Sequence, residues 1–291
     1  MDKLEQFLNR AERVLAQLET LLPVAQLAPD WSAVALRWRK SSGTFARGYL
    51  QVVHGIAPIS LADLQHFDRQ KDIIAQNTHQ FVAGKPANNV LLTGARGTGK
   101  SSLIKACLNE FADRGLRLIE VDKEDMADLA DIVELVAARP ERFIIFCDDL
   151  SFDEGEAGYK ALKVALDGSI AAQSDNVLIY ATSNRRHLLP EYMSDNLSYQ
   201  HQEDGEIHPG EGVEEKISLS ERFGLWVSFY PFRQDDYLHI VAHWLAHFGI
   251  VTADIETANW RAEALQFTLE RGSRSGRVAW QFARDWAGKH E

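Results

Sequence analysis

The residues with the clearest chemistry form one short run in the first half of the chain. The run follows the pattern G-x-x-x-x-G-K-[ST] and comprises Gly94, Ala95, Arg96, Gly97, Thr98, Gly99, Lys100 and Ser101, with Ser102 directly after it. Glycines permit backbone angles that turn successive N–H groups inward, so that they form a nest for an anion. The lysine adds a point charge for a phosphate chain, and the serine hydroxyl is a ligand for Mg²⁺. The pattern predicts a loop that binds the phosphates of ATP, with a plain glycine-rich turn as the alternative.

Two carboxylates supply the second half of this chemistry. Phe143–Cys147 is an apolar run, and Asp148 and Asp149 follow it directly. Ligands of open parallel sheets bind at the carboxyl ends of the strands, so a strand here would place both acids beside the loop. We expect Asp148 to hold Mg²⁺ together with Ser101, and Asp149 to orient or deprotonate the attacking water. A helix cap is the alternative, because Asp is common at that position.

The acidic segment resembles the Walker B motif of AAA+ ATPases, in which the second acid is usually Glu. This chain has Asp149 there, one methylene shorter, and the difference bears on the rate of hydrolysis rather than on Mg²⁺ binding. Val177–Arg185 resembles the sensor 1 strand of the same superfamily, with Asn184 at the sensor position. The resemblance implies that Asn184 bonds the terminal phosphate or the attacking water. A turn residue is the alternative, because Asn suits turns without any ligand.

Two arginine-containing segments extend the resemblance. Leu219–Gly224 resembles the S-x-R-F box of AAA+ initiators and clamp loaders, with Arg222 at the arginine-finger position. In such proteins the finger reaches the ATP of a neighbouring subunit, and an arginine supplied in this way is worth about 10³–10⁵ in rate. Arg271–Ala279 resembles the start of the sensor 2 helix, with Arg277 as the first choice for a phosphate contact and Arg274 as the second. The alternatives are a surface ion pair for Arg222 and a solvated basic helix start for the other two.

A closer resemblance is to a bacterial family of uncharacterised ATP-binding proteins in this superfamily. It rests on Leu61–Asp68, Asn88–Leu92 and Asp148–Phe152. It implies that Leu61–Phe67 lies near the adenine, at a hydrophobic wall between domains. Together, the two resemblances cover residues 56–291.

Strands and helices alternate through the middle of the chain. The expected strands are Val90–Thr93, Leu116–Val121, Phe143–Cys147 and Val177–Thr182, and the expected helices are 102–111, Met126–Ala138 and Gly158–Ala172. This alternation predicts βαβ units around a buried, mostly parallel sheet, the three-layer α/β sandwich of P-loop proteins. Residues 190–217 are polar and rich in Gly and Pro, so we expect a loop there.

Both ends of the chain are expected to be helical. Residues 1–22 have apolar positions at helical spacing, and a second short helix is expected from Asp30, with Trp31, Val34, Leu36 and Trp38 partly buried. These helices either pack on the body of the protein or form an arm that binds a partner. After residue 230 the expected helices are Asp235–Phe248, Trp260–Arg271 and Ser275–Trp286. We therefore expect an N-terminal helical extension over residues 1–55, a nucleotide-binding domain over 56–230 and a small all-helical lid domain over 231–291.

The composition is that of a globular protein, and we expect it to be cytoplasmic. No apolar run approaches the ~20 residues that span a bilayer, and the N-terminus lacks the apolar region of a secretory signal. The two cysteines, Cys107 and Cys147, have no metal-ligand spacing. The net charge of −11 does not support a surface that embraces nucleic acid, although a local basic channel stays open. The stretch 203–215 holds six acids and no Lys or Arg, and is either solvated chain or a contact for a basic partner.

The leading interpretation is an AAA+-type ATPase that binds and hydrolyses MgATP at a subunit interface. Hydrolysis would drive a conformational change on an unknown macromolecular partner, in a homo-oligomer joined through Arg222. The alternative is an ATP-gated assembly module with negligible hydrolysis, which the short Asp149 favours. A small-molecule kinase would leave Asp149, Asn184 and the arginines unexplained as a set.

Overall fold

The computed structural model of the chain describes most of its 291 residues. The described ranges are 5–13, 28–41, 47–152, 156–167, 174–185, 188, 200–201, 207–208, 219–250 and 260–290. Residues 5–13 are helical, as predicted, and the remainder of that expected helix lies outside the described residues. The six acids of the stretch 203–215, and most of the loop predicted over 190–217, also lie outside them. No helix within these ranges combines the length and the apolar character needed to cross a membrane.

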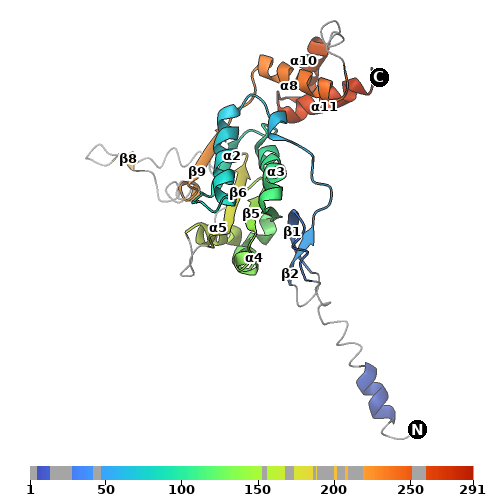
Figure 1. Cartoon of the computed structure of the whole chain (residues 1–291), viewed down its shortest axis with the longest axis vertical. Coiled ribbons are helices and arrows are strands. Elements are labelled where there is room, and N and C mark those ends of the chain that lie inside the picture. Colours follow the sequence, from blue (N-terminus) through green and yellow to red (C-terminus); the bar gives the residue numbers. More distant parts are fainter. Residues whose placement is uncertain are drawn as a thin grey trace.

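A seven-stranded sheet with the order β2-β1-β4-β5-β6-β3-β9 forms the centre of the fold (Figure 1). Its strands are β1 (Ala35–Lys40), β2 (Gly48–Val52), β3 (Val90–Gly94), β4 (Leu116–Glu120), β5 (Arg142–Cys147), β6 (Val177–Ser183) and β9 (Leu225–Phe229). All neighbours in this sheet are parallel except β1 with β2. A separate antiparallel pair joins β7 (Gln200–His201) to β8 (Ile207–His208). The mostly parallel main sheet confirms the predicted fold class.

Helices cover both faces of the main sheet. The elements on one face are α2 (Asp68–Val82) and α3 (Lys100–Phe111), and those on the other are α4 (Leu129–Ala137) and α5 (Ala157–Asp167). Short 3-10 turns are η1 (Leu61–Asp63), η2 (Ala112–Arg114) and η3 (Lys123–Asp128). Along β5, Ile144 and Phe146 pack on the α3 side, whereas Phe143 and Ile145 pack on the α4 side. A strand buried on both faces needs apolar residues throughout, which explains its continuous run.

The prediction of a second N-terminal helix from Asp30 was wrong. These residues enter β1, which pairs with β4 and lengthens the sheet by a hairpin with β2. Leu36 and Trp38 are buried, whereas Arg37 and Arg39, which alternate with them, are only partly buried. This alternation has the period of a strand, and over so few residues it can be mistaken for one helical turn.

Polar contacts hold β1 against the neighbouring strand. They join Arg37 to Glu120 at 2.5 Å, Arg39 to Asp122 at 2.7 Å, and the Trp38 Nε1–H to Asp128 Oδ2 at 2.9 Å. Each pairs a side chain of β1 with a carboxylate on β4, directly after it or in η3. The extension predicted over residues 1–55 is therefore helical only in part, and its second half belongs to the sheet.

Three helices follow the sheet, as predicted, and are here called the lid. They are α8 (Gln234–His247), α10 (Trp260–Arg271) and α11 (Gly276–Ala287), and they lie together at one end of the molecule (Figure 1). Each begins and ends within one residue of its expected bounds. The strand β9, just before the lid, was not predicted. The division of the chain at residues 55 and 230 stays a prediction.

Candidate functional site

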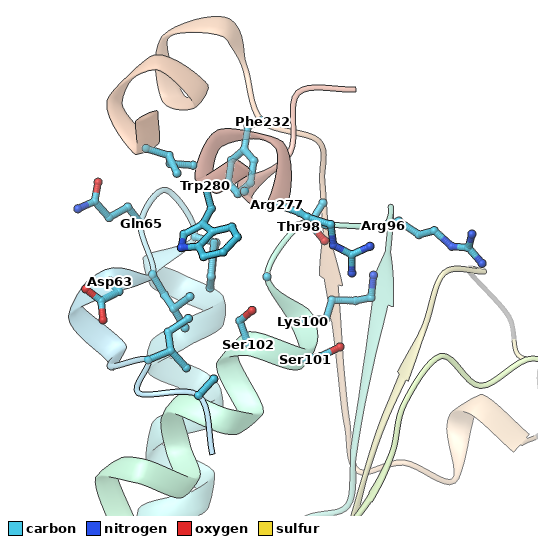
Figure 2. A pocket seen from close by; sticks show the side chains of 18 of the residues that line it. Asp63, Gln65, Arg96, Thr98, Lys100, Ser101, Ser102, Phe232, Arg277 and Trp280 are labelled. Atoms are coloured by element: carbon cyan, nitrogen blue, oxygen red, sulfur yellow. The ribbon is translucent and has the colours of Figure 1, made fainter. Parts of the chain in front are cut away.

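A cavity of about 790 Å³ lies at the carboxyl edge of the sheet, between the glycine-rich loop and the lid. Three strands end beside it: β3 leads into the loop, β5 into the two aspartates, and β6 into Asn184. Because β6 lies between β3 and β5, Asn184 stands between the loop and the aspartates. Figure 2 shows Lys100, Arg96 and Arg277 on one side of the cavity, with Trp280 and Gln65 on the other.

The loop adopts backbone angles that only glycine accepts easily. Gly94, Gly97 and Gly99 have φ angles of +135°, +76° and +98°. The space around these glycines also leaves no room for a side chain. A Cβ on Gly94 would lie 2.0 Å from the carbonyl oxygen of Phe229, and a Cβ on Gly99 would lie 3.0 Å from the Phe67 ring. The Thr98 hydroxyl closes the turn by donating to the carbonyl of Ala95 at 2.9 Å. This loop therefore has the tight curvature that the predicted phosphate nest requires.

Lys100 is held inside the loop. Its side chain is only 6% exposed. The ammonium donates to the carbonyls of Gly94 and Ala95 at 2.6 and 2.8 Å, and to Asn184 Oδ1 at 3.1 Å. Burial lowers the pKa of Lys100 below its ordinary value, although Asp149 and Asp148 act in the opposite direction. A buried cation surrounded mainly by neutral oxygens is poised to gain from an anion.

Ser101 and Asp148 meet as predicted. The Ser101 hydroxyl donates to Asp148 Oδ1 at 2.6 Å, and the Thr182 hydroxyl donates to the same oxygen at 2.5 Å. Hydroxyl and carboxylate oxygens are ligands that Mg²⁺ accepts, with phosphates and waters completing its shell. No group of three or more His, Cys, Asp or Glu side chains that could hold a metal occurs among the described residues. The oxygens of Ser101 and Asp148 are donors that fit a Mg²⁺ ion whose other ligands are phosphates and waters.

Asp149 stands beside this pair in an unusual backbone conformation. Its φ is +53°, a left-handed value that is several-fold enriched in Asp and Asn among residues other than glycine. The backbone N–H of Asp149 donates to Thr182 Oγ1 at 2.9 Å. Its carboxylate accepts from Asn184 Nδ2 through Oδ1 and from Arg96 Nη2 through Oδ2, the latter at 3.4 Å. The structure thus brings Lys100, Asn184 and Asp149 into one connected set.

The lid reaches the loop through the start of α11. The N–H of Gly276 donates to the carbonyl of Gly97 at 2.9 Å, and Ser275 caps the helix by accepting from the Val278 N–H. Arg277, in the first turn, lines the 790 Å³ cavity. Arg274 lies before the cap and lines a different cavity of about 450 Å³ behind the loop. The two arginines that the sequence left open therefore face different spaces.

Three predicted site residues do not line the cavity: Gly94 and Ala95, whose carbonyls accept from Lys100, and Arg222, which lies elsewhere. The Nε–H of Arg222 donates to Asp167 Oδ1, at the end of α5, at 2.5 Å. This is the intramolecular ion pair that the sequence left as the alternative reading. The remaining loop residue, Ser102, does line the cavity.

Apolar and aromatic side chains line much of the rest of the cavity. Leu64 and Phe67 come from the segment that the resemblance placed near a base, and they are buried. Trp244, Phe248 and Trp280 face them from the lid. The sequence interpretation missed these three. Trp280 lies one helical turn after Arg277, and that spacing is the signal that could have revealed it.

Thr182 was also missed. It lies two residues before Asn184, and side chains two apart on a strand point to the same face. That spacing could have placed its hydroxyl beside the aspartates.

The chain matches a protein-family model and has similarity to solved structures. The family model described as "Protein of unknown function (DUF815)" matches residues 31–290. No curated protein matches the sequence. Among solved structures, the chain is similar to the RuvB Holliday junction branch migration motor of Thermotoga maritima, with 16% identity and a TM-score of 0.49 over 79% of this chain and 64% of that one. It is also similar to AMPPCP-bound DnaA from Aquifex aeolicus, with 16% identity and a TM-score of 0.47 over 77% and 63%. The chain spans less than two thirds of the length of either structure.

Proposed function

The chain belongs to the DUF815 family, and we propose that it binds ATP with Mg²⁺ in this cavity and hydrolyses it as an AAA+-type ATPase. The observation that carries the proposal is the position of Lys100, buried inside a curved glycine loop with its ammonium turned to carbonyl oxygens. A phosphate chain would replace these neutral partners with charged ones, which bind an ammonium more strongly.

Further positive groups favour an anion as large as a triphosphate. Burial lowers the pKa of Lys100, and the positive charges of Arg277 and Arg96 lie close enough to lower it further. Both arginines line the same cavity. The first turn of α3, which begins at Lys100, adds the positive end of a helix dipole. One cation would serve for a monophosphate, whereas three cations at one end of the cavity suit a longer chain of phosphates.

The apolar and aromatic part of the cavity supports a nucleotide rather than inorganic phosphate. Its walls come from Leu64 and Phe67 on one side and from Trp244 and Trp280 on the other. Ligand cavities are typically about 300–1,000 Å³, and the volume of about 790 Å³ lies within that range. A base would lie against these rings while its phosphates reach the loop.

We assign the hydrolytic roles to the residues that the structure gathers at the strand ends. Ser101 and Asp148 would hold Mg²⁺, which when bound neutralises charge on the phosphate oxygens. Asp149 would orient or deprotonate the attacking water, and Asn184 would bond that water or the terminal phosphate. Arg277 would bring the lid onto the phosphates, so that hydrolysis changes the contact between lid and loop.

Arg222 is proposed to act on the ATP of a neighbouring subunit. Its pair with Asp167 must open for this, and an ion pair at the surface is weak enough to exchange. A monomer would then bind ATP and hydrolyse it slowly, and assembly into a homo-oligomer would raise the rate. The motion would act on a macromolecular partner, which the site itself does not specify.

The second candidate is an ATP-gated assembly module with negligible hydrolysis. The short side chain of Asp149, already engaged by Asn184 and Arg96, favours it. The two candidates share the same binding site and differ only in turnover.

Titration with ATP and Mg²⁺ tests the binding step. Charged hydrogen bonds contribute about 1.5–3 kcal/mol, so Lys100→Ala should weaken ATP binding by about 10- to 150-fold. Lys105→Ala is the matched control, because Lys105 lies on the same helix with an exposed side chain. Unchanged affinity in Lys100→Ala, or no saturable binding by the folded wild type, would reject the site.

Phosphate release measured against protein concentration separates the two candidates. The ATPase proposal expects the specific rate to rise with concentration and to fall in Arg222→Ala. Asp167→Ala is the control, since it breaks the same ion pair but keeps the arginine, and its rate should stay at or above that of the wild type. A rate near zero at every concentration would favour the assembly module.

A further inference from the structure

We propose that Arg96 is a positioning residue that exchanges partners: it holds the carboxylate of Asp149 in the protein alone and moves to the terminal phosphate when ATP binds. The inference rests on the proposed function and gives one loop residue a second task. That task is to release the water-activating acid only when a third phosphate is present.

The first observation is that both oxygens of Asp149 have donors. Oδ1 accepts from the Asn184 amide, and Oδ2 accepts from Arg96 Nη2 at 3.4 Å. A carboxylate with both oxygens engaged is poorly placed to accept a proton from water. Arg96 comes from the phosphate loop itself, so whatever enters the loop competes for the same guanidinium.

The second observation is that the pair is easily exchanged. The side chains of Arg96 and Asp149 are 77% and 52% exposed. Exposed ion pairs of this kind are weak, because water screens the charges and two side chains must be held in one geometry. A guanidinium binds phosphate through two parallel N–H bonds, and the terminal phosphate carries more charge than one carboxylate. The arginine should therefore prefer the phosphate.

The third observation is a continuous polar chain from the phosphate-binding lysine to the arginine. Lys100 donates to Asn184 Oδ1, Asn184 donates to Asp149, and Asp149 accepts from Arg96. A phosphate that attracts both Lys100 and Arg96 would act on this chain at its two ends at once. Asp149 would keep its place, because its backbone N–H is fixed to Thr182.

Arg277 marks the contrast with Arg96. Within the part of the chain that the structure describes, Arg277 has no ion-pair or hydrogen-bond partner, although it lines the same cavity. Arg277 can bind a phosphate without leaving another group, whereas Arg96 must leave Asp149. Of these two arginines, exchange is therefore a property of Arg96.

A double-mutant cycle on nucleotide affinity tests the exchange. The four proteins are the wild type, Arg96→Ala, Asp149→Asn and the double variant, each titrated with ATP and with ADP in the presence of Mg²⁺. Asn keeps the preference of Asp for a positive φ, so the backbone at 149 is preserved. Arg96→Ala should weaken ATP binding about tenfold and ADP binding less than about twofold, because only ATP has the terminal phosphate.

The coupling between the two substitutions is the decisive readout. Asp149→Asn should tighten ATP binding by about fivefold when Arg96 is present, because the arginine no longer has to leave its partner, and by clearly less in the Arg96→Ala background. Asp149→Asn also removes the repulsion between the carboxylate and the phosphate. This effect is the same with and without Arg96, so it cancels when the two changes in ATP affinity are compared. Equal effects in the two backgrounds would overturn the exchange, as would loss of ATP and ADP affinity to the same extent in Arg96→Ala.

Two further measurements keep the result unambiguous. Arg96→Lys retains the charge without the two-pronged geometry and should recover part of the ATP preference, which a purely structural role would not produce. Saturable ATP binding by the wild type shows that the proposed binding site stands even when the cycle is additive. Absence of that binding would instead reject the proposed function itself.

Discussion

Replacing Gly97 by alanine is expected to separate the glycine-rich loop from the lid. Gly97 has a φ of +76°, and an L side chain in that region costs about 1 kcal/mol. An added Cβ would lie 2.7 Å from the Oγ of Ser275 and 2.8 Å from its Cβ. The carbonyl of Gly97 also accepts from the Gly276 N–H at 2.9 Å, so loop and helix α11 cannot both keep their positions.

The magnitude follows from these two contributions. Inserting atoms into a packed contact costs about 1–3 kcal/mol, and with the backbone strain the free energy of unfolding should fall by about 2–4 kcal/mol. Gly272→Ala is the matched control, because its φ is +69° and nothing lies within 4 Å of an added Cβ. Both variants restrict the unfolded chain equally. The difference between them, about 1–3 kcal/mol, therefore measures the contact with Ser275.

Urea denaturation and titration with ATP together provide the assay. Gly97→Ala should lose stability and bind ATP more weakly, whereas Gly272→Ala should lose only about 1 kcal/mol and bind normally. Adding Ser275→Gly to Gly97→Ala removes the clashing atoms and should restore part of the loss, after correction for the helix cap measured in Ser275→Gly alone. If Gly97→Ala and Gly272→Ala were equal in both stability and ATP affinity, the loop–lid contact would not exist in solution.

Two further predictions concern an acid and the thiols. Asp149→Glu should lower the free energy of unfolding by about 1 kcal/mol, because Glu tolerates the φ of +53° less well than Asp; unchanged stability in urea denaturation would contradict this. Burial raises the pKa of the Cys107 and Cys147 thiols from 9.0 to about 12. Above pH 9 the unfolded chain releases protons that the folded chain keeps, so stability should fall with rising pH towards about 12, and both thiols should react with iodoacetamide at pH 8 only after denaturation. Fast labelling of the folded protein would show that the thiols are accessible.

The sequence predicted well those parts of the molecule whose structure is determined by residues close together in the chain. The strand β3 and the loop that follows it have a fixed spacing because one short segment must curve around an anion. The continuous apolar run of β5 is typical of a strand buried on both faces, and it ends at the aspartates. The lid helices repeat apolar residues over enough turns to fix their bounds within one residue.

The parts that were missed depend on partners far along the chain. Helix α2 gave no clear apolar period because its buried side includes Asn77 and Thr78. Both bond the hydroxyl of Tyr180 on β6 at 2.9 Å, and Asn77 also bonds the carbonyl of Asn88. These polar residues can be buried only because a residue far along the chain bonds them. From the sequence alone, such residues would be predicted to lie at the surface. The same holds for β1, whose arginines find their carboxylates on and after β4, a connection of more than eighty residues.

The choice between Arg274 and Arg277 shows what the structure adds to a motif. Arg274 precedes the helix and Arg277 lies at its start, and the sequence ranked Arg277 first only through the resemblance to a sensor 2 helix. Because Ser275 caps α11, Arg274 stays outside the helix and faces the cavity behind the loop, whereas Arg277 enters the first turn and faces the loop. A cation in the first turn of a helix opposes the helix dipole, and Arg277 gains no protein partner among the described residues to offset this. An anion in the cavity would relieve both costs at once, so the position that is least favourable in the protein alone is the one best suited to a bound phosphate.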